Sequence, residues 1–241
     1  MSHIIITGAT GLAGSAILQQ ALANPAVSKI SILSRRPVAS AEGNSKANVI
    51  IHKDFSSYPP ELLSQLSGAS ACIWAQGKSS IGMTEEDYTV LTKDYPIAAA
   101  QAFKTLPATG GKFNFVHVSG RGANTEGKGQ MFARVKGDAE KVLLGIAAEH
   151  STFSVYNLRP AGIDPGKNWS ADRKQSGIER TFFAIAPVIR PFMPGLFTPV
   201  YSLADVAIEL ALGDGAKLTG DGINADGFTL ENSAIRRLAG L

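Results

Sequence analysis

The chain has 241 residues, of which 44% are hydrophobic and 18% charged, and its formal net charge is +3. This composition predicts a globular protein with a substantial core and excludes a disordered or repetitive chain. Lysines and arginines are scattered along the sequence, so nucleic-acid binding is not predicted. Cys72 is the single cysteine, which excludes an internal disulfide framework and favours a reducing compartment.

The N-terminal segment carries the strongest motif. An apolar run at residues 4–6 leads into three glycines spaced three apart, and a helix-compatible stretch follows at 12–23. In this context the first glycine permits a tight turn, the second lets a pyrophosphate approach the backbone, and the third lets the helix pack against the strand. The sequence therefore predicts a dinucleotide cradle made of Gly8, Thr10, Gly11, Leu12 and Gly14.

Short apolar segments then alternate with longer segments of helical periodicity. Regular alternation of this kind favours right-handed crossovers and a doubly wound, mostly parallel Rossmann sheet with helices on both faces, an α/β fold. Ligands of such sheets bind at the carboxyl ends of the strands. The predicted strands are 29–34, 48–53, 69–75, 113–119 and 153–158, and the predicted helices are 60–66, 85–106 and 132–150.

From Arg159 onward, prolines and glycines punctuate apolar pieces, which predicts a small substrate or lid region. The apolar side chains of this region would form the wall of a pocket for a hydrophobic substrate, or would simply pack in the core. Its arginines would bind an anionic group of the substrate, or would simply flank a helix. These residues are Arg180, Phe182, Phe183, Arg190, Phe192, Met193 and Phe197. A helix at 203–212, a short strand near 228–230 and a helix after Asn232 are expected to return to the main body. We therefore predict a single domain over 1–241, with a dinucleotide-binding core at 3–163, a lid at 164–202 and C-terminal elements at 203–241.

The residues after the second predicted strand indicate which nicotinamide cofactor binds. NAD-binding relatives of this fold carry an acidic residue there, about 20 residues beyond the glycines. This chain has Arg35 and Arg36 instead, and two guanidinium groups favour the 2′-phosphate of NADP(H). The alternative is that both arginines are ordinary solvated loop residues.

Two further loops are candidate cofactor contacts. Asp54 follows the third strand, where it would meet the adenine edge or cap the next helix. Ala75, Gln76 and Gly77 follow the fourth strand, where small residues would let the dinucleotide pass or would simply form a turn. The four histidines are dispersed without ligand spacing, so no metal site is predicted. We also expect no cleaved leader and no membrane span, since no apolar run reaches about 18 residues.

These motifs together resemble the short-chain dehydrogenase/reductase superfamily, in particular its atypical, Tat-interacting-protein-like oxidoreductase group. The resemblance covers residues 3 to about 163 and includes the glycine turn, the arginine pair, and the segments 118–119, 135–137 and 158–160. It implies that Ser119 hydrogen-bonds a substrate carbonyl and that a tyrosine acts as acid and base. It further implies that Lys136 holds the nicotinamide ribose and lowers the pKa of that tyrosine, and that Pro160 belongs to the cofactor-binding residues.

Phe132 stands where the resemblance implies the catalytic tyrosine. It lies four residues before Lys136, on the same helical face, but a phenyl ring can neither give nor take a proton. General acid–base catalysis is worth about 10² to 10⁴-fold in rate, so a standard carbonyl reductase would be impaired. The open substitutes are Ser119 acting with Lys136, or one of Tyr88, Tyr95 and Tyr201, for which ring packing is the alternative. His117 shares a strand face with Ser119 and is expected to be a buried, hydrogen-bonded histidine.

Three functions are consistent with this sequence. The first is an NADP(H)-dependent atypical short-chain oxidoreductase acting on a small apolar carbonyl or alcohol. The second is an NADP(H)-binding sensor without redox turnover, and the third is an isomerase or cyclase on the same scaffold. The resemblance implies a cytoplasmic location or peripheral attachment to the mitochondrial outer membrane, and by analogy a homodimer formed through helices 85–106 and 132–150.

Overall fold

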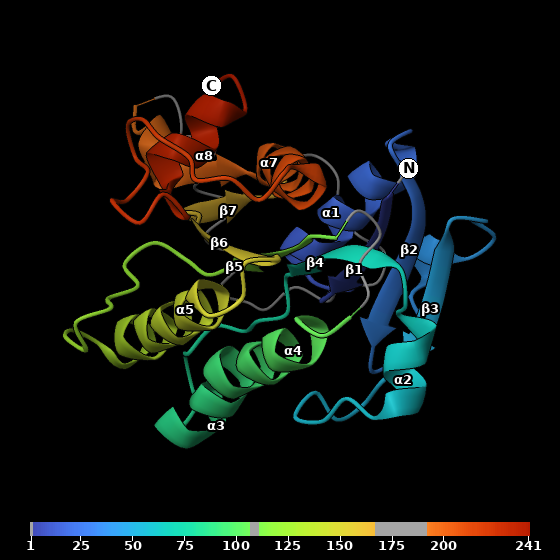
Figure 1. The fold of residues 1–241 in the computed structure, drawn as a ribbon. Coiled ribbons are helices and arrows are strands. Elements are labelled where there is room, and N and C mark those ends of the chain that lie inside the picture. The colour runs from blue at the N-terminus through green and yellow to red at the C-terminus, as the bar shows by residue number, and fades with distance from the viewer. Residues whose placement is uncertain (1, 107–110, 167–191) are drawn as a thin grey trace.

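The computed structural model describes residues 2–106, 111–166 and 192–241, which adopt a Rossmann-like α/β fold (Figure 1). Among these residues, seven strands pair in parallel to form one sheet in the order β3-β2-β1-β4-β5-β6-β9. The order reverses between β1 and β4, which is the point where such sheets bind ligands. The strands are β1 Ser2–Thr7, β2 Val27–Ser34, β3 Ala47–Ile51, β4 Ala69–Trp74, β5 Phe113–Val118, β6 Phe153–Arg159 and β9 Thr229–Glu231.

Helices cover both faces of the sheet, as expected for strands joined by crossover connections (Figure 1). One face packs against α1 Leu12–Ala23, α7 Val200–Leu212 and α8 Asn232–Leu238. The other packs against α2 Pro60–Gln65, α4 Tyr95–Phe103 and α5 Met131–Ala148. The central strands are buried on both sides, and Ile4, Ile5 and Ile6 in β1 are all fully buried, whereas the edge strand β3 is partly exposed. The predicted α/β fold class is therefore confirmed.

The long helix predicted at 85–106 is wrong as a single element. It consists of α3 Glu85–Thr89, a π-helical turn Val90–Asp94, and α4, which ends at Phe103. The break coincides with Pro96, which has no N–H to donate to the carbonyl four residues earlier, so the regular helical pattern cannot continue through it. A π turn inserts one residue and is a common way of accommodating such an interruption.

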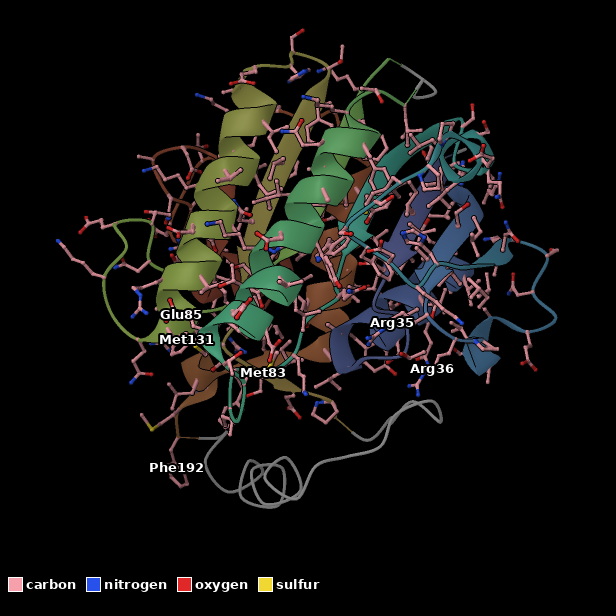
Figure 2. All side chains as sticks on the ribbon, turned by 90° about the horizontal axis from the view of Figure 1, so that it is seen from below. Arg35, Arg36, Met83, Glu85, Met131 and Phe192 are labelled. Carbon is pink, nitrogen blue, oxygen red and sulfur yellow. The ribbon has the colours of Figure 1, made fainter. Side chains whose placement is uncertain are left out.

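Two short strands were not predicted. β7 Gly162–Asp164 and β8 Phe197–Pro199 pair in parallel and bring together the two ends of the predicted lid. Most of that lid, including Arg180, Phe182, Phe183 and Arg190, lies outside the described residues. Of the predicted apolar wall, Phe197 is buried in the core, whereas Phe192 is 84% exposed and projects from the surface (Figure 2). The remaining described elements are two short 3₁₀ turns, Ala39–Ala41 and Pro194–Leu196.

Candidate functional site

The turn between β1 and α1 requires glycine at two positions. Gly8 has a backbone φ of +69°, and a Cβ placed there would lie 2.4 Å from the carbonyl oxygen of Ala75. A Cβ on Gly14 would lie 2.1 Å from the carbonyl oxygen of Gly8, so α1 packs directly on the turn. Gly11 is the N-cap of α1, and no side chain caps the first N–H groups of this helix. These N–H groups, with the helix dipole behind them, form a site suited to an anion.

Two buried polar atoms beside this turn lack a hydrogen-bond partner among the described residues. They are Oγ1 of Thr7, at the end of β1, and Nε2 of Gln76, just after β4. An unpaired buried polar group costs about 1–3 kcal/mol, so such atoms commonly mark a place where a ligand or water binds. Thr10 is half-buried in the turn itself, and Gly77 has open space where a Cβ would lie.

The arginine pair lies at the end of β2, close to the glycine turn. Both Arg35 and Arg36 are exposed and project on the side of the molecule that carries α1 (Figure 2). The backbone N–H of Arg36 donates to Oγ of Ser34 over 3.4 Å, which folds the loop back on the strand. These positions are suited to a phosphate ester bound at the carboxyl end of β2.

Asp54 lies in an exposed turn after β3. Its Oδ1 accepts hydrogen bonds from the backbone N–H of Ser56 at 3.0 Å and from its hydroxyl at 2.5 Å, and these bonds lower the pKa of Asp54. α2 begins after Pro59, so the alternative in which Asp54 caps this helix is wrong. The carboxylate instead closes its own turn.

Lys136 is the charged group at the carboxyl end of β5. Its Nζ donates to the backbone carbonyl of Ser119 over 2.6 Å, and a Cβ on Gly120 would lie 2.5 Å from the same nitrogen. Burial lowers the pKa of Lys136 to about 8, while the carboxylate of Glu140 acts in the opposite direction. Phe132, Lys136 and Glu140 are spaced four apart and share one face of α5. The ring of Phe132 is half-buried and lies 3.6 Å from the Cβ position of Gly122.

The hydroxyl of Ser119 does not point to open space. Its Oγ donates to Oε1 of Glu140 over 2.5 Å, and Glu140 is fully buried. Arg159 at the end of β6 donates to both oxygens of Glu140, and its Nη1 lies 2.7 Å from Oε1 of Glu231 in β9. Pro160, which follows, is buried, and its carbonyl accepts the N–H of Arg121 over 2.8 Å.

The three candidate tyrosines all have other contacts. Tyr88 is buried and its hydroxyl pairs with Thr92, while burial raises its pKa. The ring of Tyr95 packs 6.1 Å from that of Phe55, centroid to centroid. The hydroxyl of Tyr201 donates to Gln19 on α1 over 3.1 Å. Ring packing, the alternative considered from the sequence, describes their placement.

His117 is a buried, hydrogen-bonded histidine, as predicted. Its Nδ1 lies 3.0 Å from Oδ1 of Asn157, the residue beside it on β6, and burial lowers the pKa of His117 to about 4. The ring is therefore neutral near pH 7. Nδ2 of Asn157 and Nε1 of Trp74, which flanks His117 on β4, have no hydrogen-bond partner among the described residues.

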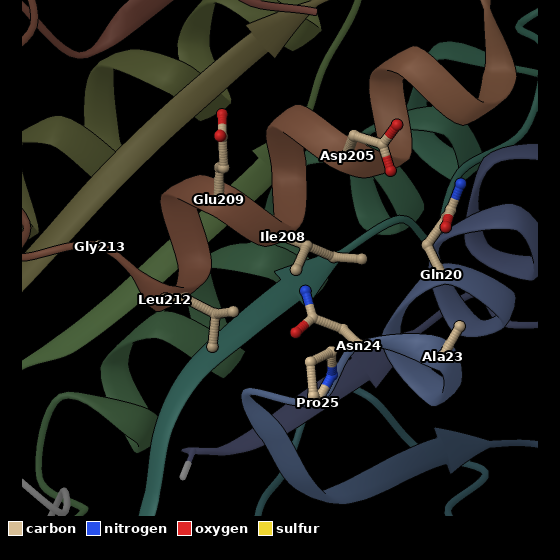
Figure 3. Close-up of a pocket in the computed structure, with 9 residues that line it drawn as sticks. All are labelled: Gln20, Ala23, Asn24, Pro25, Asp205, Ile208, Glu209, Leu212 and Gly213. Carbon is tan, nitrogen blue, oxygen red and sulfur yellow. The ribbon is translucent and has the colours of Figure 1, made fainter.

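A separate hollow lies at the opposite end of α1, where this helix meets α7 (Figure 3). Its volume is about 400 Å³, and it is lined by Gln20, Ala23, Asn24, Pro25, Asp205, Ile208, Glu209, Leu212 and Gly213. None of the predicted site residues lines it. In the described part of the chain, no cluster of three or more His, Cys, Asp or Glu side chains is arranged for a metal, and no helix has the length and apolarity to cross a membrane.

Comparison with known proteins identifies relatives by sequence. The chain is 39% identical over 180 residues to leucinostatins biosynthesis cluster protein T of Purpureocillium lilacinum, which covers 67% of this chain and 65% of that protein's length. It is 30% identical over 232 residues to protein fmp52, mitochondrial, of Aspergillus fumigatus, covering 92% of this chain and 90% of that protein. The chain belongs to the Fmp52 family.

A third relative of the chain is botcinic acid biosynthesis cluster B protein 16 of Botryotinia fuckeliana. It is 32% identical over 158 residues, which cover 60% of this chain and 98% of that protein. No protein-family model matches the chain.

Solved structures with the same fold include reductases and a nucleotide-sugar epimerase. An oxidoreductase of the short-chain dehydrogenase/reductase family from Burkholderia thailandensis has a TM-score of 0.66 and 12% identity, over 99% of this chain and 95% of that one. The PhqB reductase domain of Penicillium fellutanum has a TM-score of 0.65 and 16% identity, over 88% of this chain and 64% of that one. The UDP-glucuronic acid 4-epimerase of Bacillus cereus, solved in complex with NAD, has a TM-score of 0.62 and 15% identity, over 86% and 71%. The Fmp52 family member therefore shares the Rossmann-like fold of these proteins.

Sequence reasoning located the elements of this site but missed the groups that surround Lys136. It quoted Arg159 without assigning a partner to it, and it did not single out Glu140 or Glu231. The available signal was the spacing of Glu140, one turn beyond Lys136 on a helix face that must be buried.

Proposed function

We propose that the chain is an NADP(H)-dependent oxidoreductase that reduces a small apolar carbonyl compound or oxidises the corresponding alcohol. The observation that carries this proposal is the placement of Lys136 at the carboxyl end of β5, in the same row of strand ends as the glycine turn of β1. β4 separates these two strands, so the turn and the lysine are about 10 Å apart at ordinary strand spacing. An extended dinucleotide spans such a distance.

The residues present fit this cofactor. The N–H groups in the first turn of α1, which no side chain caps, would hold the pyrophosphate, and the unpaired polar atoms of Thr7 and Gln76 flank its path. Arg35 and Arg36 would hold the 2′-phosphate, and Lys136 would hold the nicotinamide ribose. The cofactor would supply the hydride in the reductive direction.

In this proposal Lys136 provides the proton that a tyrosine would otherwise give. One of its three N–H donors is taken by the carbonyl of Ser119, which leaves two for the ribose and for the substrate oxygen. A lysine whose pKa is about 8 is a far better acid than an ordinary lysine, and it regains its proton from water after each turnover. Ser119 then acts mainly through its backbone carbonyl, because its hydroxyl is bonded to Glu140.

A second candidate is an NADP(H)-binding protein without redox turnover, favoured by the phenyl ring at position 132. NADPH oxidation in the presence of a broad panel of apolar aldehydes and ketones separates the two functions. Turnover with any of them supports the first, and tight NADPH binding without turnover supports the second.

The kind of substrate is supported by the names of two relatives. Both are named as biosynthesis cluster proteins, which favours a small-molecule substrate.

Cofactor choice is tested by calorimetric titration with NADPH and NADH. The double variant Arg35→Ala/Arg36→Ala is expected to weaken NADPH binding by about 10² to 10⁴-fold, because two charge-assisted hydrogen bonds worth roughly 1.5–3 kcal/mol each are lost, while NADH binding changes little. Lys141→Ala, which removes an exposed charge from α5, serves as the control and should change neither affinity. Equal weakening of both cofactors, or no binding of either at millimolar concentration, would contradict the proposal.

We also propose a domain organisation, a location and an oligomeric state. The single domain with core 3–163, lid 164–202 and C-terminal elements 203–241 can be tested by limited proteolysis. For the location, which we propose to be cytoplasmic or peripheral on the mitochondrial outer membrane, the names of the Fmp52 relatives support an association with mitochondria. A homodimer formed through α4 and α5 can be tested by sedimentation.

A further inference from the structure

Four polar side chains form a cluster beneath Lys136, of which three are buried and the fourth, Glu231, has a side chain that is 34% exposed. Ser119 follows β5, Glu140 lies on α5, Arg159 ends β6, and Glu231 ends β9. Glu140 is fully buried, Ser119 is 6% exposed and Arg159 is 8% exposed. Buried charges occur where they are paired, and here the guanidinium of Arg159 is shared between the two carboxylates.

Ser119 connects this cluster to the lysine through two different atoms. Its hydroxyl donates to Glu140, and its carbonyl, in the same residue, accepts the ammonium of Lys136. The bond from this hydroxyl to Glu140 therefore ties the backbone that carries the carbonyl to α5, beside the bond from the N–H of Ser119 to the carbonyl of Leu158 at 2.8 Å. The cluster also balances the charge around Lys136. Its two carboxylates face only one arginine, so the ammonium of Lys136 supplies the second positive charge.

Few other charged groups lie near Lys136 in the described part of the chain. From β5 it faces His117, which is neutral near pH 7 and whose pKa is lowered in part by Lys136. From β6, Arg159 lies beyond Glu140. From the π turn packed against α5, Lys93 pairs with Asp138 over 3.6 Å, and both side chains are partly exposed. Glu140 is thus the carboxylate that offsets the burial of Lys136.

We infer that Glu140 is a positioning residue for Lys136: through the hydroxyl of Ser119 it fixes the carbonyl that holds the lysine, and through its charge it keeps the lysine in the ammonium form. The role of Lys136 in proton delivery rests on the proposed function, but its placement by Glu140 does not. The inference can therefore be tested in the cofactor-free protein.

The experiment follows the protonation of Lys136 directly. The protein is prepared with ¹³Cε-labelled lysine, the Lys136 signal is assigned from its absence in Lys136→Met, and its chemical shift is titrated with pH. In Glu140→Gln the titration midpoint is expected to fall by about one pH unit, because a nearby carboxylate favours the charged form of lysine. In Glu231→Gln, which removes a carboxylate from the same arginine but touches neither Ser119 nor Lys136, the midpoint should stay at its original value.

Glu140→Asp separates the two parts of the inference and covers the case in which Glu140→Gln fails to fold. It retains the charge but is one carbon too short to keep its bond to Ser119, so the midpoint should change little while the Lys136 signal moves or broadens at every pH. A midpoint in Glu140→Gln equal to that of the original protein, or equal shifts in Glu140→Gln and Glu231→Gln, would overturn the inference. If Glu140→Gln does not fold, an unmoved Lys136 signal in Glu140→Asp overturns it. Failure of the original protein to bind NADPH would overturn the proposed function and leave these readouts intact.

Discussion

The two faces of the central sheet are built from different side chains. The face under α1, α7 and α8 is aliphatic and carries a buried cluster of Ile, Leu, Val and Ala. Among the described residues of this cluster, Tyr156 is the one buried aromatic ring. The face under α2, α4 and α5 is rich in aromatic rings, namely Phe55, Trp74, Phe103, Phe113, Phe115 and Phe153. At the carboxyl ends of the strands, this second face also carries the buried groups His117, Glu140 and Arg159.

Polar groups serve different purposes on the two faces. On the aliphatic face, Nδ2 of Asn114 donates to the carbonyls of Leu210 and Gly213 and so completes the end of α7. On the aromatic face, the polar side chains bond to one another and lead to Lys136. Water is excluded there, which strengthens each electrostatic interaction. The aliphatic face thus positions the glycine turn, and the aromatic face maintains the charge of the lysine.

The largest expected change in stability comes from a matched pair of glycines, one on each face. A Cβ on Gly14 would lie 2.1 Å from the carbonyl oxygen of Gly8, and a Cβ on Gly137 in α5 would lie 1.9 Å from that of Asn124. Both contacts are with backbone that cannot simply rotate away. We expect Gly14→Ala and Gly137→Ala each to lower the free energy of unfolding by about 3 kcal/mol, measured by urea denaturation.

Gly145 provides the control for this pair. It lies on the same helix as Gly137, but nothing is within 4 Å of its Cβ position. Gly145→Ala should therefore raise the free energy of unfolding by about 0.5–1 kcal/mol, the usual helix preference for alanine. Similar results for Gly137→Ala and Gly145→Ala would show that α5 does not pack against the loop at Asn124 as closely as described.

A smaller decrease in the free energy of unfolding is expected at acid pH, and we expect it to come from His117 on the aromatic face. The pKa of His117 is about 4 in the folded chain and 6.5 when exposed, so the unfolded state binds more protons between these values. Stability should be complete above pH 6.5 and should fall as the pH decreases towards 4. The contribution of His117 is at most about 3 kcal/mol. Urea denaturation at pH 7 and pH 4.5 should show a smaller loss in His117→Gln than in the original protein, and equal losses would contradict the assignment.

The sequence was sufficient where structure depends on local pattern. The glycine turn, the helix at 12–23 and the alternation of strands and helices follow from periodicity and from the conformational freedom of glycine at position 8. The π turn was missed, because the proline at 96 interrupts one hydrogen bond while the hydrophobic period continues on both sides.

The buried cluster could not be predicted by the same reasoning. Its hydrogen-bonded pairs are separated by 19 to 72 residues along the chain, and composition rules place Glu and Arg on the surface. Only the strand order, which brings the ends of β5, β6 and β9 together, makes Arg159 a neighbour of both Glu140 and Glu231. The expected catalytic hydroxyl of Ser119 is bonded to Glu140 for the same reason.

The smallest change in stability is expected from Phe132→Tyr, which adds one hydroxyl at the polar end of the aromatic face. The ring is half-buried and its edge lies over Gly122, which has no side chain, so the hydroxyl should fit at a cost below about 1 kcal/mol. Its effect on NADPH oxidation distinguishes the two candidate functions. If Lys136 already delivers the proton, a second acid one helical turn away should raise turnover by no more than about 10-fold. If the original protein has no acid at this position, the gain should approach the full 10² to 10⁴-fold of general acid catalysis. Phe132→Leu, which changes the ring without adding a hydroxyl, should give no gain in either case.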